Sequence, residues 1–273
     1  MSTIDILIPT YRRPAALAVT LTSLIAQSYR DFRIIISDQT EESDATATGE
    51  VQAVLRVLRV HGHDIQIHKH LPRRGIAEQR QFLLEQANAP YSLFIDDDLI
   101  LEPDVVERML VAIQEEQCGF VGCAFIGLSH VDQIHFDEHN IDFWDSSVQP
   151  EIVRHHTPQW ERWRLHNGAN IYHIQQKLGI TSAKPRKYRV TWVPACVMYD
   201  TAKLRELGGF NFWHELPPEH CGEDVLVQLR VMAMYGGCGV LPSGVYHQEL
   251  PTTISDRHIA ADNVLEWGNI AIS

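Results

Sequence analysis

The sequence predicts an α/β fold class, with an open, mostly parallel sheet flanked by helices. Short aliphatic runs alternate with segments whose apolar residues recur at helical spacing, and these units follow one another about every thirty residues. With 273 residues and 45% hydrophobic content, the chain can bury a sizeable core. Sheets of this kind bind ligands outside the carboxyl ends of their strands, so a site is expected at that edge.

The first half of the chain has the clearest pattern. Residues 4–8 form an aliphatic run that Pro9 stops, and Pro14 stands where the first turn of a helix accepts proline. Strands are predicted at residues 4–8, 33–37, 64–68, 91–95 and 119–125. Helices are predicted at residues 14–25, 51–58, 76–88 and 103–113.

Between residues 128 and 188 the periodicity is poor, apart from a possible helix over 160–178. The stretch is rich in histidine, but no pair has the H-x-x-x-H spacing of a metal site on one helix face, so structural or surface histidines are favoured. Regular patterns return at 190–193 and 196–199, then in a helix capped by Asp200 and another opened by 222–224. Short runs at 239–241 and 246–247 follow.

Nothing in the sequence marks a domain boundary. There is no internal repeat and no low-complexity linker, so a single domain over 1–273 is expected.

Composition excludes several classes of function. The formal net charge of −12 argues against nucleic acid as the main partner. Five cysteines, without C-x-x-C spacing, favour reduced thiols and a cytoplasmic location over disulfides or a thiolate zinc site. No apolar run is long enough to span a bilayer, so any membrane contact would be peripheral.

Three consecutive carboxylates, Asp96, Asp97 and Asp98, follow the apolar run 93–95. Adjacent acids raise one another's pKa unless a counter-charge is supplied, and a divalent cation commonly supplies it. The alternative is a solvated acidic turn, because Asp is a frequent turn residue. Residues 9–13 and Asp38 also follow strands, so the sheet would bring them to the same edge as these acids.

Taken together, five motifs resemble those of the family 2 glycosyltransferases of the GT-A fold, which have a single Rossmann-like sheet. They are residues 8–14, 37–38, 74–80, 94–98 with Pro103, and 222–224. The resemblance covers about residues 4 to 125 and 190 to 248 and leaves 128–188 as an acceptor-side insertion. It implies that residues 1–125 form the nucleotide-sugar-binding half of the domain, and that residues 126–273 form its acceptor-binding half with the C-terminal tail. It implies metal-dependent, inverting transfer of a sugar from a nucleoside-diphosphate donor to a hydroxyl acceptor. That acceptor would be a glycan, a lipid-linked molecule or a small molecule.

The resemblance also implies a metal site. Asp96 and Asp98 occupy the two acid positions of the family's D-x-D motif, with Asp97 between them. Asp98 would bind the metal directly, while Asp96 would lie nearer the ribose and donor sugar. His247 matches a position where some GT-A enzymes have a further metal ligand. Hard oxygen ligands suit Mn²⁺ or Mg²⁺.

For the nucleotide, the resemblance implies a pocket lined by Pro9, Thr10, Tyr11 and Arg13. Asp38 would accept hydrogen bonds from the base, which favours uracil, and so a UDP-sugar, while leaving guanine and thymine open. Alternatively, Asp38 caps a turn. Arg13 could likewise be an exposed charged residue with no role in binding. Arg80 matches an arginine facing the nucleotide, but Gln81 replaces the asparagine that commonly follows.

For catalysis, the resemblance implies Asp224 as the general base that deprotonates the acceptor, supported by Glu223. One base and a metal-bound leaving group suffice for a single displacement. The structural alternative for Asp224 is a helix cap. Four tryptophans are candidates for stacking on sugar rings, or else belong to the core: Trp144, Trp160, Trp163 and Trp213.

Two other classes of function compete with this one. A retaining glycosyltransferase or a nucleotidyltransferase could use a similar sheet, although a nucleotidyltransferase would be expected to have a glycine-rich phosphate loop that residues 9–13 lack. The second competing class is a protein that binds sugar nucleotides or glycans without catalysing a reaction.

Overall fold

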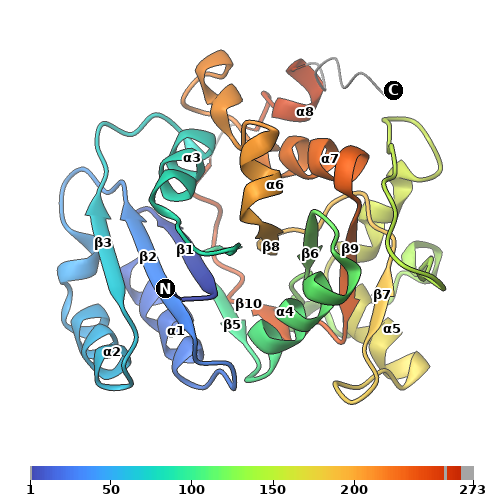
Figure 1. The fold of residues 1–273 in the computed structure, drawn as a ribbon, viewed down its shortest axis with the longest axis horizontal. Coiled ribbons are helices and arrows are strands. Elements are labelled where there is room, and N and C mark those ends of the chain that lie inside the picture. The colour runs from blue at the N-terminus through green and yellow to red at the C-terminus, as the bar shows by residue number, and fades with distance from the viewer. Residues whose placement is uncertain (1, 255–256, 266–273) are drawn as a thin grey trace.

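The computed structural model describes residues 2–254 and 257–265. Its main sheet has eight strands (Figure 1). In spatial order they are β3 (Ile65–Lys69), β2 (Phe32–Asp38), β1 (Ile4–Thr10), β4 (Tyr91–Ile95), β8 (Cys196–Asp200), β6 (Phe120–Gly122), β9 (Gly237–Leu241) and β7 (Arg186–Tyr188). The first four strands are parallel, and β8 lies antiparallel to both β4 and β6. The predicted α/β class is confirmed.

Two cores lie on the two faces of the sheet. Because side chains alternate along a strand, Ile6 and Ile8 of β1 contribute to one core and Leu7 to the other. The first core takes apolar residues from α1 (Pro14–Ile25), α2 (Gly49–Val60) and α4 (Val105–Glu116). The second takes them from α3 (Ile76–Gln86), α5 (Asn170–Leu178), α6 (Thr201–Glu206), α7 (Glu223–Tyr235) and α8 (Ala261–Val264).

A second, two-stranded sheet extends the strand edge where the acids lie. It pairs β5 (Leu99–Leu101) antiparallel with β10 (Val245–His247), so that His247 lies opposite Leu99. This pairing brings a histidine from the end of the chain next to Asp98, across about 150 residues of sequence.

The strands and helices predicted before residue 119 are confirmed, with ends that shift by a few residues. Three later predictions were wrong in detail. The strand at 119–125 is shortened to β6, and residues 190–193 form no strand. The helix over 160–178 is interrupted, because Gly168 has a φ of +51° that separates the 3-10 helix Trp160–His166 from α5.

Residues 190–193 lack strand partners for a specific reason. The backbone N–H of Val193 donates to the Gln228 side-chain oxygen over 2.7 Å, and the Val193 carbonyl accepts from the Gln228 amide over 2.8 Å. A side chain of α7 therefore replaces the neighbouring strand. Throughout the described ranges, no helix is both long and apolar enough to cross a membrane.

A buried histidine predicts how stability responds to acid. Nε2 of His166 lies 3.0 Å from the Tyr188 hydroxyl, and burial lowers the pKa of His166 to about 4. An unfolded histidine titrates near about 6.5, so between about pH 6.5 and pH 4 only the unfolded chain takes up this proton. We expect this residue to remove about 3 kcal/mol of stability as the pH falls through that window. Urea unfolding should show a shallower pH dependence in His166→Gln than in the unchanged chain; equal slopes would contradict the assignment.

Candidate active site

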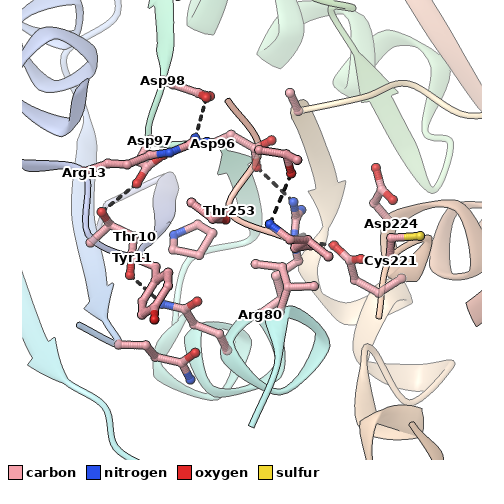
Figure 2. Close-up of a pocket in the computed structure, with 18 of the residues that line it drawn as sticks. Thr10, Tyr11, Arg13, Arg80, Asp96, Asp97, Asp98, Cys221, Asp224 and Thr253 are labelled. Carbon is pink, nitrogen blue, oxygen red and sulfur yellow. Dashed lines mark hydrogen bonds and ion pairs between the residues drawn. The ribbon is translucent and has the colours of Figure 1, made fainter. Parts of the chain in front are cut away.

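A cavity of about 400 Å³ opens at the carboxyl ends of β1 and β4, where α7 also begins. Eleven of the twelve residues proposed from the sequence line it, and the close-up in Figure 2 shows several of them. They are Pro9, Thr10, Tyr11, Arg13, Arg80, Asp96, Asp97, Asp98, Glu223, Asp224 and His247. Asp38 is the exception.

The three consecutive acids have three different environments. The Thr10 hydroxyl donates to Asp97 over 2.6 Å, and burial raises the pKa of Asp97 to about 7. Asp98 is only 3% exposed, and its Oδ2 lies 2.6 Å from Nη1 of Arg13 and 3.4 Å from Nε2 of His247. Although burial acts in the opposite direction, the hydrogen bond from His247 and the charge of Arg13 lower the pKa of Asp98.

His247 has a defined tautomer when neutral. Its Nδ1 accepts the backbone N–H of Glu249 over 2.7 Å, so the ring proton is on Nε2 and points toward Asp98. The hydrogen bond to Asp98 raises the pKa of His247. Arg13 completes this corner by donating to the carbonyl of Pro251, which belongs to the segment that lines the outer side of the cavity.

The donor types at this corner suit a divalent metal. A carboxylate and an imidazole nitrogen are ligands of Mn²⁺ and, less commonly, Mg²⁺, and both ions leave further positions to water or to phosphate oxygens. Within the part of the chain that the structure describes, no cluster of three or more His, Cys, Asp or Glu side chains could hold a metal. Asp98 and His247 would thus be the protein ligands, and Arg13 would have to leave the Asp98 carboxylate. The ring proton of His247 would have to move from Nε2 to Nδ1, which would end the bond that Nδ1 accepts from the Glu249 N–H.

Arg80 joins the two acidic sides of the cavity. It extends from α3, is 7% exposed, and lies with Nη2 2.9 Å from Asp96 and Nε 3.1 Å from Glu223. Burial opposes its charge, but Asp96 and Glu223 more than compensate and raise the pKa of Arg80. The guanidinium therefore stays charged and holds both carboxylates in place.

The two acids at the start of α7 differ in exposure. Glu223 is 4% exposed, and burial, followed by the nearby charge of Asp224, raises its pKa to about 7. Asp224 is half-buried and lies across the cavity from Thr10 and Arg13 (Figure 2). The helix cap is Gly222 and not Asp224. A Cβ on Gly222, whose φ is +74°, would come within 2.5 Å of an Asp262 oxygen, so the turn that presents Asp224 needs glycine.

The Asp38 carboxylate faces its own loop. It is 1% exposed and accepts from Thr40 N at 2.8 Å, Ala45 N at 3.0 Å and Lys69 Nζ at 2.9 Å. Its neighbour Gln39 lines the cavity instead. These contacts are those of a residue that caps a turn, which was the alternative role of Asp38.

Sequence reasoning missed several lining residues, among them Gln39, Arg73, Gln79 and His220. His220 donates from Nδ1 to the Pro217 carbonyl at 2.6 Å and accepts the Ala77 N–H at Nε2 at 3.2 Å. These two bonds require neutral imidazole, and burial lowers its pKa accordingly. His220 thereby connects the start of α3 to the loop before α7, a contact that no local sequence pattern signals.

Comparison with protein families decides the assignment. The model of the family described as "Glycosyl transferase family 2" matches residues 5–183, which is more than half of the chain. The chain belongs to glycosyl transferase family 2. Family membership and fold together support a glycosyltransferase. No curated protein sequence matches the chain.

Solved structures of other glycosyltransferases have a similar fold. Staphylococcus aureus TarS 1–349 in complex with UDP-GlcNAc aligns with a TM-score of 0.56 and 15% identity over 92% of this family 2 chain and 60% of that one. A second crystal structure of TarS aligns with a TM-score of 0.55 and 16% identity, over 90% of this chain and 36% of that one. The mannosyltransferase PcManGT from Pyrobaculum calidifontis, solved with GDP-Man and Mn²⁺, aligns with a TM-score of 0.51 and 13% identity. The alignment covers 87% of this chain and 56% of PcManGT. At these identities the likeness shows the GT-A fold.

The aromatic candidates of this family 2 chain separate into different environments. Trp144 is 8% exposed, belongs to the first core and packs under Arg189, so its stacking on a sugar is excluded. Trp213 contacts the ring of His214, with centroids 3.6 Å apart. Trp160 and Trp163 instead both contact Trp192.

Proposed function

We propose that the chain is a metal-dependent, inverting glycosyltransferase that transfers a sugar from a UDP-sugar to a hydroxyl acceptor. The single observation that carries the proposal is the arrangement of the cavity. The strand-end acids and Arg13 lie on one side, the half-buried Asp224 lies on the other, and Arg80 joins the two sides. The donor would bind at the first side and the acceptor at the second.

Asp224 is the group that takes the acceptor proton. Its pocket exposure lets a hydroxyl reach it, whereas Glu223 is buried against Arg80 and positions the start of α7. A base on one side of the sugar and a leaving group on the other favour one displacement with inversion. A bound Mn²⁺ or Mg²⁺ would neutralise charge on the departing diphosphate.

On the donor side, the chain's own residues hold the nucleotide. The Tyr11 ring lies under the guanidinium groups of Arg12 and Arg73, at 4.9 and 4.5 Å from the ring centroid. Arg73 lines the cavity, and its positive charge suits a diphosphate, whereas Arg12 is ion-paired with Glu42 and lies outside the cavity lining. We propose that Gln39 contacts the base, because it lines the cavity where Asp38 does not.

The proposed metal site can be tested by replacing Arg13 and Asp98, because the two substitutions should change Mn²⁺ affinity in opposite directions. Arg13 is ion-paired with the Asp98 carboxylate, so Arg13→Met should free that carboxylate and tighten Mn²⁺ binding. Asp98→Asn should instead weaken Mn²⁺ binding about tenfold or more, which corresponds to a loss of about 1.4 kcal/mol in binding free energy. Calorimetric titration of Mn²⁺ without donor measures both. The metal site would be wrong if Asp98→Asn bound Mn²⁺ as tightly as the unchanged chain.

Product analysis separates the remaining classes. A glycosyltransferase releases a nucleoside diphosphate, and a nucleotidyltransferase releases pyrophosphate. Proton NMR of the first product formed also reports the anomeric configuration. Release of pyrophosphate, or retention at the anomeric carbon, would overturn the proposed reaction, and donor binding without any turnover would support the non-catalytic alternative.

A further inference from the structure

Three tryptophans form one cluster, and one of them, Trp192, is two residues before Pro194, which lines the cavity. The Trp192 ring centroid lies 5.5 Å from that of Trp160 and 6.3 Å from that of Trp163. The Trp163 and Trp192 rings are inclined by only 11°, so their faces have the same orientation. All three side chains are half-buried, in contrast to Trp144 in the core. We call this set the tryptophan shelf.

The shelf is fixed to the start of α7, which carries the proposed base. Gln228, one helical turn after Asp224, bonds both the N–H and the carbonyl of Val193, the residue next to Trp192. Pro194 and Ala195, which follow directly, line the cavity. The shelf is therefore continuous in the chain with the acceptor wall of the active site.

A second set of bonds holds the other half of the shelf. The Thr191 hydroxyl lies within 2.9 Å of the Gln159 carbonyl and 2.8 Å of the Trp160 carbonyl. This joins the 3-10 helix carrying Trp160 and Trp163 to the segment carrying Trp192. A bonded support of this kind is what a rigid stacking surface needs, because a mobile ring would lose entropy on binding.

The chemistry of the shelf favours a saccharide. Aromatic rings offer flat apolar faces, and the apolar C–H face of a pyranose can lie on them while its hydroxyls reach polar neighbours. Polar neighbours are present, because the exposed residues Gln159, Glu161 and Arg164 adjoin Trp160 and Trp163 in the sequence. Stacked nucleobases are disfavoured as occupants because the chain has a net charge of −12.

We propose that the acceptor is a saccharide and that the tryptophan shelf binds a sugar ring next to the one that receives the transferred residue. Trp160 and Trp163 belong to residues 128–188, the part of the chain that the sequence resemblance leaves as an insertion, and Trp192 lies at the start of the part that follows it. This inference rests on the proposed function, since it takes the Asp224 side of the cavity as the acceptor side.

The test uses the full chain with saturating UDP and Mn²⁺. A panel of di- and trisaccharides of glucose, galactose, mannose and N-acetylglucosamine is titrated, and binding is measured by saturation-transfer NMR and calorimetry. We expect at least one saccharide to bind. Trp163→Ala should weaken it about tenfold, and Trp163→Phe, which keeps an aromatic face, should restore most of the affinity. Phe136→Ala removes a 75% exposed aromatic side chain outside the shelf and serves as the matched control.

The outcomes are distinct from those that test the proposed reaction. If no saccharide of the panel binds, or if Trp163→Ala binds as tightly as the unchanged chain, the shelf has no such role. Should nucleoside-diphosphate release occur with an acceptor that has no sugar, the inference fails while the glycosyltransferase stands. If a saccharide binds but no nucleoside diphosphate is released, the proposed role of the shelf would be supported and the proposed reaction would be wrong.

Discussion

Replacing Asp224 with Asn should lower kcat about 10²- to 10⁴-fold, the range that general-base catalysis contributes. The change keeps the size of the side chain and its bond to the Val225 N–H, observed at 2.9 Å, but removes the group that takes the acceptor proton. Because Asp224 lies on the far side of the cavity from Arg13, donor affinity should change less than twofold. Initial rates of nucleoside-diphosphate release and calorimetry with the donor measure the two quantities.

Asp145→Asn is the matched control for this variant. It removes an acid that is exposed and lies outside the cavity, so turnover should stay within twofold. Unchanged turnover in Asp224→Asn would remove the base assignment. A parallel loss of donor affinity would instead place Asp224 on the donor.

The edge of the sheet was predictable from the sequence because strand ends follow from simple patterns. Aliphatic runs before Pro9 and Asp96 indicate buried parallel strands, and parallel strands carry their ends to one edge. Four of the five residues 9–13, all but Arg12, accordingly line one cavity together with the three acids. The contact of His247 with Asp98 follows from no local pattern, because it depends on the pairing of β5 with β10, and only the resemblance pointed to it. Arg13 reaches Asp98 from the start of α1.

The insertion resisted prediction for a different reason. Apart from α5 and β7, it has little regular structure, and single side chains hold it and the segment that follows. Thr191 donates to the Trp160 carbonyl, and Gln228 bonds both backbone groups of Val193. The periodicity of apolar residues predicts regular helices and strands, but it does not predict segments that are held by individual side-chain hydrogen bonds. Asp38 shows the same limit, since the resemblance implied that its carboxylate binds the base, whereas Lys69 and two backbone N–H groups donate to that carboxylate in the structure.

The second large effect is expected from Arg80→Met. The substitution keeps a long apolar stem but leaves Glu223 buried and Asp96 facing the cavity without their shared cation. Breaking a buried ion pair on one side costs about 3–5 kcal/mol, and we expect a loss of that size in the free energy of unfolding at pH 8. Urea denaturation followed by far-UV circular dichroism measures it. Arg74→Met, a change at an exposed arginine, should cost less than about 0.5 kcal/mol.

Adding Glu223→Gln distinguishes loss of charge pairing from loss of packing. If Arg80 acts mainly as counter-charge, the double variant should be more stable than Arg80→Met alone, because the uncompensated buried charge is gone. Acid should have the same effect, since burial already raises the pKa of Glu223 to about 7 and loss of Arg80 raises it further. Glu223 would then be protonated in the native state of Arg80→Met, so the deficit should shrink as the pH falls from 8 to 6. A deficit independent of pH and of Glu223 would mean that Arg80 stabilises the chain through its packing against Phe94, whose ring centroid lies 5.9 Å from the guanidinium carbon.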